Sequence, residues 1–201
     1  MMLVLATGNA HKGREISEIL QEEIDIKIKM LSDYPGLVLP PESGNTYQEN
    51  ATIKALYVSK ATGHWALGDD SGLEVSALNG APGLFSARFA GEKATDQDNR
   101  QKLLKEMRGL PEGKRQARFI CCMAIANPQG ETKRITGICD GEITGSESGK
   151  SGFGYDPIFY YPPLKKTFAE LNHEEKNKIS HRGKAVRSAL SLFTSEIINL
   201  D

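Results

Sequence analysis

The chain has 201 residues and a formal net charge of -1, and 39% of its residues are hydrophobic. This length suits one domain of ordinary size, and the hydrophobic content is sufficient for a core. The balanced charge argues against a protein that mainly holds polyanionic DNA or RNA, whereas a site for one small anion is compatible with it.

The cysteines Cys121, Cys122 and Cys139 include an adjacent pair and have no CxxC spacing. They therefore indicate neither a zinc site nor a disulfide framework, which agrees with a reducing cytosol. No charged-then-apolar signal segment opens the chain, and no apolar run approaches the ~20 residues that span a bilayer. The sequence predicts a cytoplasmic protein that binds neither nucleic acid nor a membrane.

A strand, a glycine turn and a helix are expected at the start of the chain. The apolar residues 3–6 run into Thr7-Gly8-Asn9, and apolar residues then recur at helical spacing, with Lys12 in the first turn. Backbone N–H groups and the positive end of the helix dipole at such a turn attract anions, and Lys12 adds charge. The turn is not a P-loop, because the Gly-Lys-Ser/Thr ending is missing.

Residues 24–28 alternate well enough for a second strand, and the prolines that follow mark a loop containing Glu42. The next helix is expected to begin near Thr46, because Thr46 and Glu49 have capping-box spacing. Asn50, Lys54 and Tyr57 share one side of this helix. A solvated face is the more common explanation of such a side.

Asp69 and Asp70 stand at an expected break between two strand-like pieces, with glycines on both sides. The residues alone favour a turn, because Asp, Ser and Gly are turn formers. If the backbone is a regular strand, the two acids face opposite ways and at most one enters a common site. A magnesium-bound phosphate site uses one or two carboxylates, so one acid could bind metal while the other deprotonates water.

The middle of the chain reads as a scaffold. Thr95 is expected to cap a helix that Gly109 and Pro111 stop. Residues 117–125 alternate as a strand, and residues 131–139 return as its hairpin partner.

Residues 145–154 are rich in glycine and serine and are expected to form a mobile loop that enters the site. The following Tyr155-Asp156-Pro157 continues a segment whose glycines permit close backbone approach and whose aromatic rings could stack on a purine. Such stacking is worth roughly 1–3 kcal/mol. A buried aromatic strand beginning at Tyr155 explains the same residues equally well.

A closing helix is expected after Ser180, which is a credible N-cap. His181 and Arg182 would then lie at a positive helix end beside Lys176, which suits a phosphate or an electron-rich base edge. A solvated cluster of basic residues is the usual alternative. The expected inner stripe of this helix consists of Val186, Ala189, Leu190, Phe193 and Ile197.

The order of these motifs resembles the inosine/xanthosine triphosphate pyrophosphatase family over nearly the whole chain. The motifs are Thr7-Gly8-Asn9-x-x-Lys12, Glu49-Asn50-Ala51-x-x-Lys54-Ala55, Asp69-Asp70-Ser71-Gly72-Leu73, Gly80-Ala81-Pro82-Gly83 with Ser86-Ala87-Arg88, Gly152-Phe153-Gly154-Tyr155-Asp156-Pro157 and Ser180-His181-Arg182-Gly183. The resemblance implies an elongated α/β fold in which two lobes, within a single domain over residues 1–201, flank an active-site cleft around a long mixed β-sheet with flanking helices. It also implies Mg²⁺ and a homodimer.

The resemblance further implies a hydrolase acting on phosphoric anhydrides. It would convert the non-standard purine nucleoside triphosphates ITP, dITP and XTP to the monophosphate and pyrophosphate, which keeps them out of DNA and RNA. By motif position, Asp70 would be the catalytic base and a metal ligand, with Glu42 as a second ligand and Asp69 supporting. The implied substrate-binding residues are Thr7, Gly8, Asn9, Ala10, His11, Lys12, Lys54, Ser71, Phe153, Gly154, Tyr155, Asp156, Lys176, His181 and Arg182.

Hydrogen bonding can explain selectivity among purine bases. Inosine and xanthine present a 6-oxo acceptor and an N1–H donor, whereas adenine presents a donor and an acceptor at the same positions. A pocket that donates to O6 from His181 or Arg182 would leave groups unpaired with ATP, and such mismatches can discriminate by ~10⁴ or more. Two other hypotheses compete. One is a Maf-like pyrophosphatase acting on modified pyrimidine or methylated nucleotides, and the other is a non-enzymatic module that binds purine nucleotides or RNA, the latter with a steep salt dependence.

Overall fold

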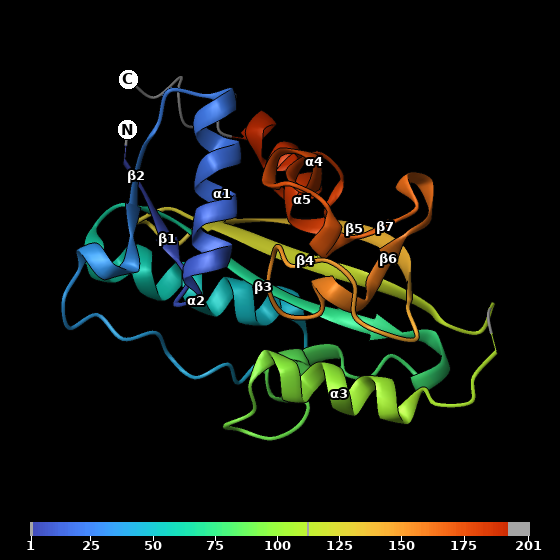
Figure 1. Ribbon diagram of the computed structural model, residues 1–201. Coiled ribbons are helices and arrows are strands. Elements are labelled where there is room, and N and C mark those ends of the chain that lie inside the picture. The colour runs from blue at the N-terminus through green and yellow to red at the C-terminus, as the bar shows by residue number, and fades with distance from the viewer. Residues whose placement is uncertain (1, 112, 193–201) are drawn as a thin grey trace. The chain divides into compact units, whose positions relative to one another are not determined.

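The computed structural model describes residues 2–111 and 113–192, which form a mixed α/β fold (Figure 1). The strands are β1 (Met2–Ala6), β2 (Lys27–Met30), β3 (Trp65–Val75), β4 (Gln116–Ala126), β5 (Thr132–Ile143), β6 (Phe159–Tyr161) and β7 (Lys166–Thr167). They form one sheet in the order β2-β1-β3-β4-β5-β6-β7. The helices are α1 (Ala10–Glu23), α2 (Tyr47–Thr62), α3 (Asp96–Glu106), α4 (His173–Ile179) and α5 (His181–Leu192).

The sheet is mixed in strand direction. β1 is parallel to both β2 and β3, whereas β6 is antiparallel to both β5 and β7. The predicted fold class, a mixed sheet with flanking helices, is therefore confirmed.

The chain divides into two compact units. Unit 1 comprises the described parts of residues 1–70, 121–137 and 181–201, and unit 2 comprises residues 71–120 and 138–180. Strands β3, β4 and β5 each contribute residues to both units. The single domain that the sequence suggests stays a prediction.

In unit 1, strand β1 is buried on both faces. Leu3 and Leu5 belong to one apolar cluster with residues of α1 and α5, whereas Val4 and Ala6 belong to another with Val58 of α2. Parallel strands are buried in this way because their crossover helices cover both faces of the sheet. Strand β1 therefore packs against α1 and α5 on one face and against α2 on the other.

The predicted break at Asp69 and Asp70 is wrong. β3 runs without interruption from Trp65 to Val75, and both acids are buried within it. A central strand has a hydrogen-bonding neighbour on each side, and this pairing outweighs the local turn preference of Asp, Ser and Gly.

Two other strand expectations also need correction. The second strand begins at Lys27, because Ile24 instead ends α1, its N–H donating to the carbonyl of Leu20. The aromatic strand begins at Phe159, after a 3₁₀ turn over Asp156–Ile158. Helix α4, with Asn172 as its N-cap, was not expected.

The predicted starts of three helices are confirmed. Thr46 and Thr95 accept hydrogen bonds from backbone N–H groups in the first turns of α2 and α3. Helix α5 begins at His181, directly after Ser180, and Val186 and Ala189 are buried in unit 1. Phe193 and Ile197 lie outside the described residues.

The segment 145–154 has no regular secondary structure, but hydrogen bonds hold it. The N–H of Ser148 donates to the carbonyl of Pro157 at 2.8 Å. The N–H groups of Lys150 and Ser151 both donate to the carbonyl of Ala169, at 3.1 and 3.0 Å. These contacts argue against the mobility expected from the glycine and serine content. Within 2–111 and 113–192, no helix is both long enough and apolar enough to cross a bilayer.

Candidate active site

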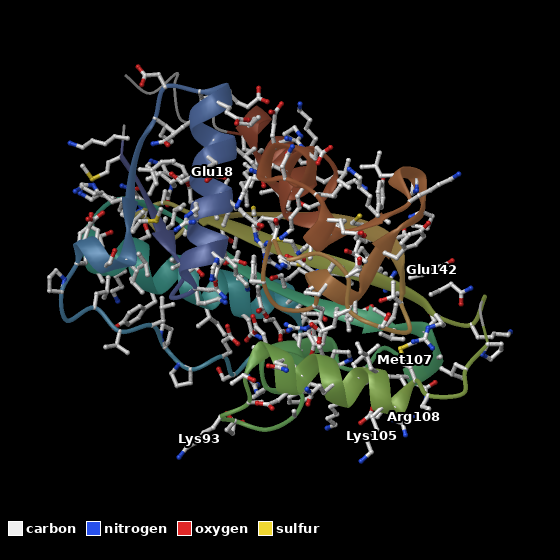
Figure 2. All side chains as sticks on the ribbon, in the orientation of Figure 1. Glu18, Lys93, Lys105, Met107, Arg108 and Glu142 are labelled. Carbon is white, nitrogen blue, oxygen red and sulfur yellow. The ribbon has the colours of Figure 1, made fainter. Side chains whose placement is uncertain are left out.

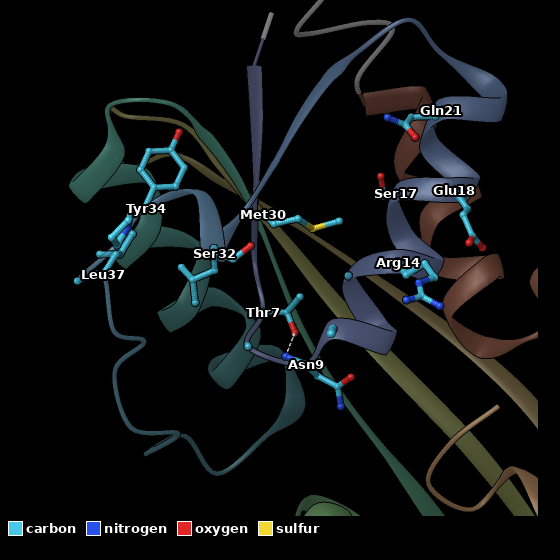
Figure 3. A pocket seen from close by; sticks show the side chains of 16 residues that line it. Thr7, Asn9, Arg14, Ser17, Glu18, Gln21, Met30, Ser32, Tyr34 and Leu37 are labelled. Carbon is cyan, nitrogen blue, oxygen red and sulfur yellow. Dashed lines mark hydrogen bonds between the residues drawn. The ribbon is translucent and has the colours of Figure 1, made fainter.

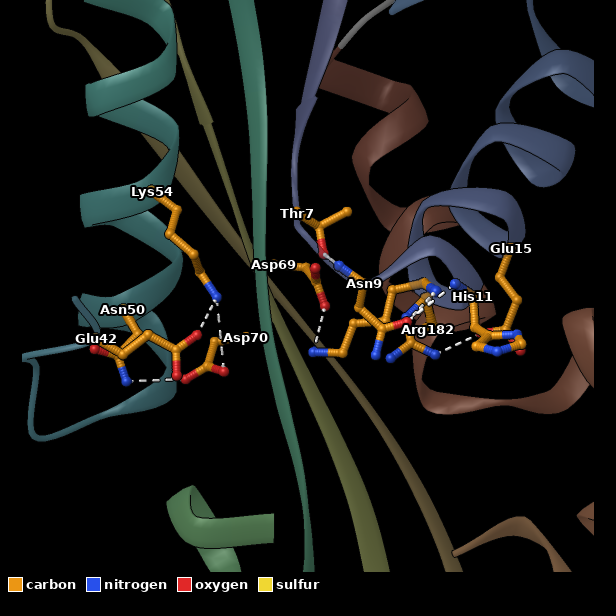
Figure 4. Close-up of polar contacts among 11 residues, drawn as sticks. Thr7, Asn9, His11, Glu15, Glu42, Asn50, Lys54, Asp69, Asp70 and Arg182 are labelled. Atoms are coloured by element: carbon orange, nitrogen blue, oxygen red, sulfur yellow. Dashed lines mark hydrogen bonds and ion pairs between the residues drawn. The ribbon is translucent and has the colours of Figure 1, made fainter. Parts of the chain in front are cut away.

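Asp69 and Asp70 project from opposite faces of β3, as neighbouring residues of a regular strand must (Figure 4). Lys12 of α1 forms an ion pair with Asp69, and Lys54 of α2 forms one with Asp70. The two acids of one motif therefore occupy two different environments.

Asp69 is held as a carboxylate. The Nζ of Lys12 lies 3.1 Å from its Oδ2. Burial raises the pKa of Asp69, but the positive charges of Lys12, Arg182 and Lys54 outweigh this effect and lower the pKa to about 2. An acid with so low a pKa is a weak base and a permanent anion at neutral pH.

Asp70 is the more basic acid. Burial raises its pKa, and the charge of Glu42 adds to this, while Lys54 and a hydrogen bond from Asn50 oppose it. The net pKa of Asp70 is raised above its ordinary value. Of the two acids, Asp70 is therefore better suited to remove a proton from water.

Helix α2 supplies the contacts around Asp70. The Nζ of Lys54 lies 2.7 Å from Oε1 of Glu42 and 3.8 Å from Oδ1 of Asp70. Asn50 donates from Nδ2 to Oδ2 of Asp70 at 3.0 Å, and its Oδ1 accepts from the N–H of Gly44 at 2.8 Å, which sets the orientation of the amide. A solvated face is thus wrong for Asn50 and Lys54, because both are buried, whereas Tyr57 on the same side is exposed.

Asn50 was named in a motif but not as a site residue. The available signal was its i, i+4 spacing to Lys54, which places both side chains on one side of α2. That spacing became informative only once the partner acid, Asp70, was known to face α2.

Side chains of the turn between β1 and α1 accept hydrogen bonds from some of the backbone N–H groups there. Asn9 caps α1, its Oδ1 accepting from the N–H groups of His11 and Lys12 at 3.0 and 3.2 Å. Thr7 accepts from the N–H of Asn9 at 3.3 Å. An anion at this turn therefore competes with Asn9 for the amides of His11 and Lys12, and the ammonium group of Lys12 is its strongest attraction.

A pocket of about 750 Å³ lies beside the same turn (Figure 3). Its walls come from the turn, from α1 and from the segment that follows β2. It is lined by Thr7, Gly8, Asn9, Ala10, Gly13, Arg14, Ser17, Glu18, Gln21, Met30, Leu31, Ser32, Tyr34, Pro35, Gly36 and Leu37. Lys12, Asp69 and Asp70 do not line it, so this pocket is distinct from the ion pair of Lys12 with Asp69.

His181 and Arg182 begin α5, and both are buried. Arg182 donates from Nη1 to Oε2 of Glu15, a buried acid of α1 (Figure 4). Burial lowers the pKa of Arg182, but Glu15, Cys121 and Asp69 outweigh this and raise it, so the side chain stays charged. The alternative of a solvated basic cluster is wrong for Arg182.

Glu15 is a residue that sequence reasoning missed. The available signal was an acid three residues after Lys12, on a helix whose neighbouring position Ile16 is apolar. Its partner Arg182 is 167 residues away in the chain, so no local pattern could have paired them.

The remaining predicted residues belong to unit 2. Oδ2 of Asp156 accepts from the N–H of Phe153 at 2.8 Å and from Nζ of Lys176 at 2.6 Å. The same Nζ lies 4.7 Å from the centroid of the Phe153 ring. Tyr155 is buried and donates to the carbonyl of Ser86 at 2.9 Å, so the half-buried Phe153 is better placed than Tyr155 to stack on a base. Gly154 and Ser71 are also half-buried.

The carboxylates of Glu42 and Asp70 fit a magnesium ion. Both carboxylates pair with the same ammonium group, that of Lys54, so the two negative charges lie close to one point. Among the residues that the structure describes, no group of three or more His, Cys, Asp or Glu side chains could hold a metal. Mg²⁺ does not need such a cage, because it commonly binds one or two carboxylates together with waters and substrate phosphates.

The fold and this site define an α/β protein with a basic turn at the end of β1 and two neighbouring buried acids that are paired with different lysines. A model of the Ham1 family matches residues 3–192. The chain belongs to the Ham1 family.

Similar proteins agree over nearly the full length. The chain is 49% identical over 193 residues to a dITP/XTP pyrophosphatase of Desulforamulus reducens, covering 96% of each protein. It is 48% identical over 187 residues to a dITP/XTP pyrophosphatase of Bacillus cereus, covering 92% of this chain and 91% of the relative.

Solved structures are similar as well. A HAM1 protein from Coxiella burnetii superimposes with a TM-score of 0.87 at 42% identity, covering 96% of this chain and 98% of that one. A nucleoside-triphosphatase / dITP/XTP pyrophosphatase from Mycobacterium abscessus superimposes with a TM-score of 0.75 at 37% identity, covering 96% of this chain and all of that one.

Proposed function

We propose that this chain is a dITP/XTP pyrophosphatase, which hydrolyses dITP, ITP and XTP to the nucleoside monophosphate and pyrophosphate. One observation carries the proposal: Asp70 has a raised pKa beside Glu42 and Lys54, while its neighbour Asp69 holds Lys12 at the turn after β1. The dITP/XTP pyrophosphatases that share about half of this sequence support the choice of substrate.

Water attack on a phosphoryl group needs alignment and charge neutralisation more than covalent help from the protein. Asp70 accepts the proton of the attacking water, for which its raised pKa suits it. Asn50 donates to one oxygen of Asp70 and thereby helps to fix the orientation of the carboxylate.

Lys12 neutralises the phosphate chain. Asp69 orients its ammonium group, and because Asp69 remains ionised the pair keeps its geometry over the working pH range. The turn residues Thr7, Gly8, Asn9, Ala10 and His11 bind the phosphates through backbone groups at the positive end of α1.

Glu42 and Asp70 would hold Mg²⁺. The ion, when bound, neutralises the charge of the phosphate oxygens and helps to orient the water. Lys54 pairs with both acids in the structure, and its ammonium group would add positive charge for a phosphate oxygen beside them.

We propose that His181 and Arg182 of unit 1 recognise the purine by donating to its 6-oxo group. Within unit 2, Phe153 offers a ring face on which a base can stack. Adenine presents a donor where the 6-oxo group would be, so ATP leaves these donors unpaired. Asp156 and Lys176 are the other residues of unit 2 that we propose to bind the substrate.

We also propose that the protein works as a cytoplasmic homodimer.

Product analysis tests the function. ITP, dITP, XTP, ATP and GTP are each incubated with and without Mg²⁺, and monophosphate plus pyrophosphate is resolved from diphosphate plus phosphate. We expect magnesium-dependent pyrophosphate release mainly from ITP, dITP and XTP. Release of single phosphate, or turnover only of modified pyrimidine nucleotides in a parallel series, would overturn the proposal.

A further inference from the structure

Helix α3 is tied to the loop over residues 145–156, which we call the nucleotide loop, by side chains that have no part in the proposed chemistry. Oδ2 of Asp96 accepts from the N–H of Gly154 at 2.7 Å. Nη1 of Arg100 donates to the carbonyl of Gly154 at 2.9 Å, and Nε of Arg100 lies 3.1 Å from Oε1 of Glu147. Two residues one helical turn apart thus hold both polar groups of Gly154.

These contacts fix the backbone around Phe153. Gly154 has a φ of 58°, in the left-handed region that a glycine adopts readily but other residues seldom adopt. With both its N–H and its carbonyl held, the peptide planes on either side of Gly154 cannot turn freely. The ring of Phe153 and the pair of Asp156 with Lys176 therefore depend on α3 for their positions.

Helix α3 can act as a support because other contacts anchor it. Oδ1 of Asn99 accepts from the N–H of Ala90 at 2.7 Å, and its Nδ2 donates to the carbonyl of Ala87 at 3.2 Å. Nζ of Lys102 donates to the carbonyl of Phe89 at 2.7 Å. Removing a contact to Gly154 should therefore release the loop and leave the helix in place.

We infer that Asp96 and Arg100 are positioning residues that set the conformation of the nucleotide loop and thereby the affinity for the purine substrate. This inference rests on the proposed function only for its kinetic consequence. Both residues act through Gly154 and need not touch the substrate, so their loss should weaken binding and leave the chemical step largely intact.

The test compares Arg100→Ala and Asp96→Ala with Lys105→Ala. Lys105 is a matched control, because it is an exposed cation on the same helix and its side chain points away from the ribbon (Figure 2). Steady-state kinetics with dITP and amide hydrogen exchange of residues 145–156 are measured for each variant.

We expect KM for dITP to rise about five- to tenfold in Arg100→Ala with kcat within about twofold of the parent value, since uniform binding is lost but transition-state contacts are kept. Arg100→Lys should give an intermediate KM, because one ammonium group can replace only one of the two contacts of the guanidinium. Amide exchange in the loop should accelerate in both alanine variants, and Lys105→Ala should match the parent protein in every measurement.

An unchanged KM in both alanine variants overturns the inference, as does a fall in kcat with KM unchanged. If the parent protein does not hydrolyse dITP, the proposed function fails by itself. Amide exchange then decides the positioning role alone, faster exchange supporting it and unchanged exchange overturning it. If Arg100→Ala does not fold, Asp96→Ala and Arg100→Lys carry the same comparison.

Discussion

Asp69 and Asp70 differ in basicity although they are neighbours in one strand. The strand directs Asp69 toward Lys12 and Arg182, whose charges lower its pKa to about 2 in spite of burial. It directs Asp70 toward α2, where burial and the nearby Glu42 raise the pKa above its ordinary value in spite of Lys54. Because neighbouring side chains of a strand point to opposite faces, Asp69 stays ionised while Asp70, on the other face, is the more basic acid.

The substitution Asp70→Asn tests the base. The amide keeps the shape of the side chain but cannot accept the proton, so we expect kcat to fall by about 10²–10⁴-fold. Nucleotide binding, measured by calorimetry, should change much less. In the parent enzyme, turnover should decline as the pH falls through the pKa of Asp70, which burial raises above its ordinary value. A parent-like kcat in the variant would contradict this role.

The substitution Asp69→Asn tests whether the ionised carboxylate of Asp69 stabilises the folded protein. In the folded protein the pKa of Asp69 is depressed to about 2, so its carboxylate stabilises the fold above the ordinary pKa of an aspartate, and this stabilisation is lost as the pH falls toward 2. The full contribution is about 2 kcal/mol. Urea unfolding should therefore show a gap between parent and variant at pH 6 that narrows by pH 2. A gap independent of pH would show that the ionised form has no special stability.

At the scale of elements, α2 approaches the sheet very closely near the two acids. Ala51 and Ala55 of α2 form a small apolar cluster with Ala124 and Ala126 of β4. Gly68 lies directly before the acid pair, and a Cβ there would be 2.3 Å from the carbonyl oxygen of Ala51. Small residues on both elements therefore allow Asn50 and Lys54 to reach Asp70.

The substitution Gly68→Ala should disturb this packing. The obstructing atom belongs to the backbone of α2, so the helix must shift, and we expect a loss of about 1–3 kcal/mol in the free energy of unfolding. Turnover should fall as well, because Lys54 moves with the helix. Gly8→Ala is the control for stability, since a Cβ at Gly8 meets no atom within 4 Å. Equal stability losses in the two variants would refute the packing argument.

In the molecule as a whole, the residues proposed to hold the metal, Glu42 and Asp70, do not belong to the apolar clusters of the core. Among residues 2–111 and 113–192, no three-residue group of metal-binding side chains occurs, and the two apolar clusters of β1 form without any polar ligand. A metal bound by two carboxylates at an open site contributes to catalysis and little to folding.

Chelation separates these two roles. EDTA should abolish turnover, added Mg²⁺ should restore it, and the melting temperature without nucleotide should be the same in both conditions. With dITP and excess metal, the melting temperature should rise, because ligands that bind only the folded state stabilise it. A large fall of the melting temperature on chelation alone would place the metal among the structural elements.

The division into two units bears on cooperativity. The single domain predicted from the sequence should unfold in one transition. Trp65 is the one tryptophan of the sequence and belongs to unit 1, whereas far-UV circular dichroism reports on both units. We expect the two signals to change at the same urea concentration. Separate midpoints would show that the units unfold independently.

Patterns in the sequence predict contacts between residues that lie close together in the chain. The caps Asn9, Thr46 and Thr95 contact atoms two or three residues away, so the starts of α1, α2 and α3 could be predicted from short patterns. The order of the motifs also indicated the family and the acids at its centre. Both inferences can be made without knowing which segments of the chain are in contact in the folded protein.

Contacts between segments that are distant in the chain become visible only in the folded protein. Asn50 and Asp70 are 20 residues apart, and Glu15 and Arg182 are 167 residues apart. Patterns in the sequence describe one face of one element, and they cannot show which face of another element lies opposite. For the same reason the acid pair read as a turn, since the neighbouring strands that keep β3 extended lie far away in the chain.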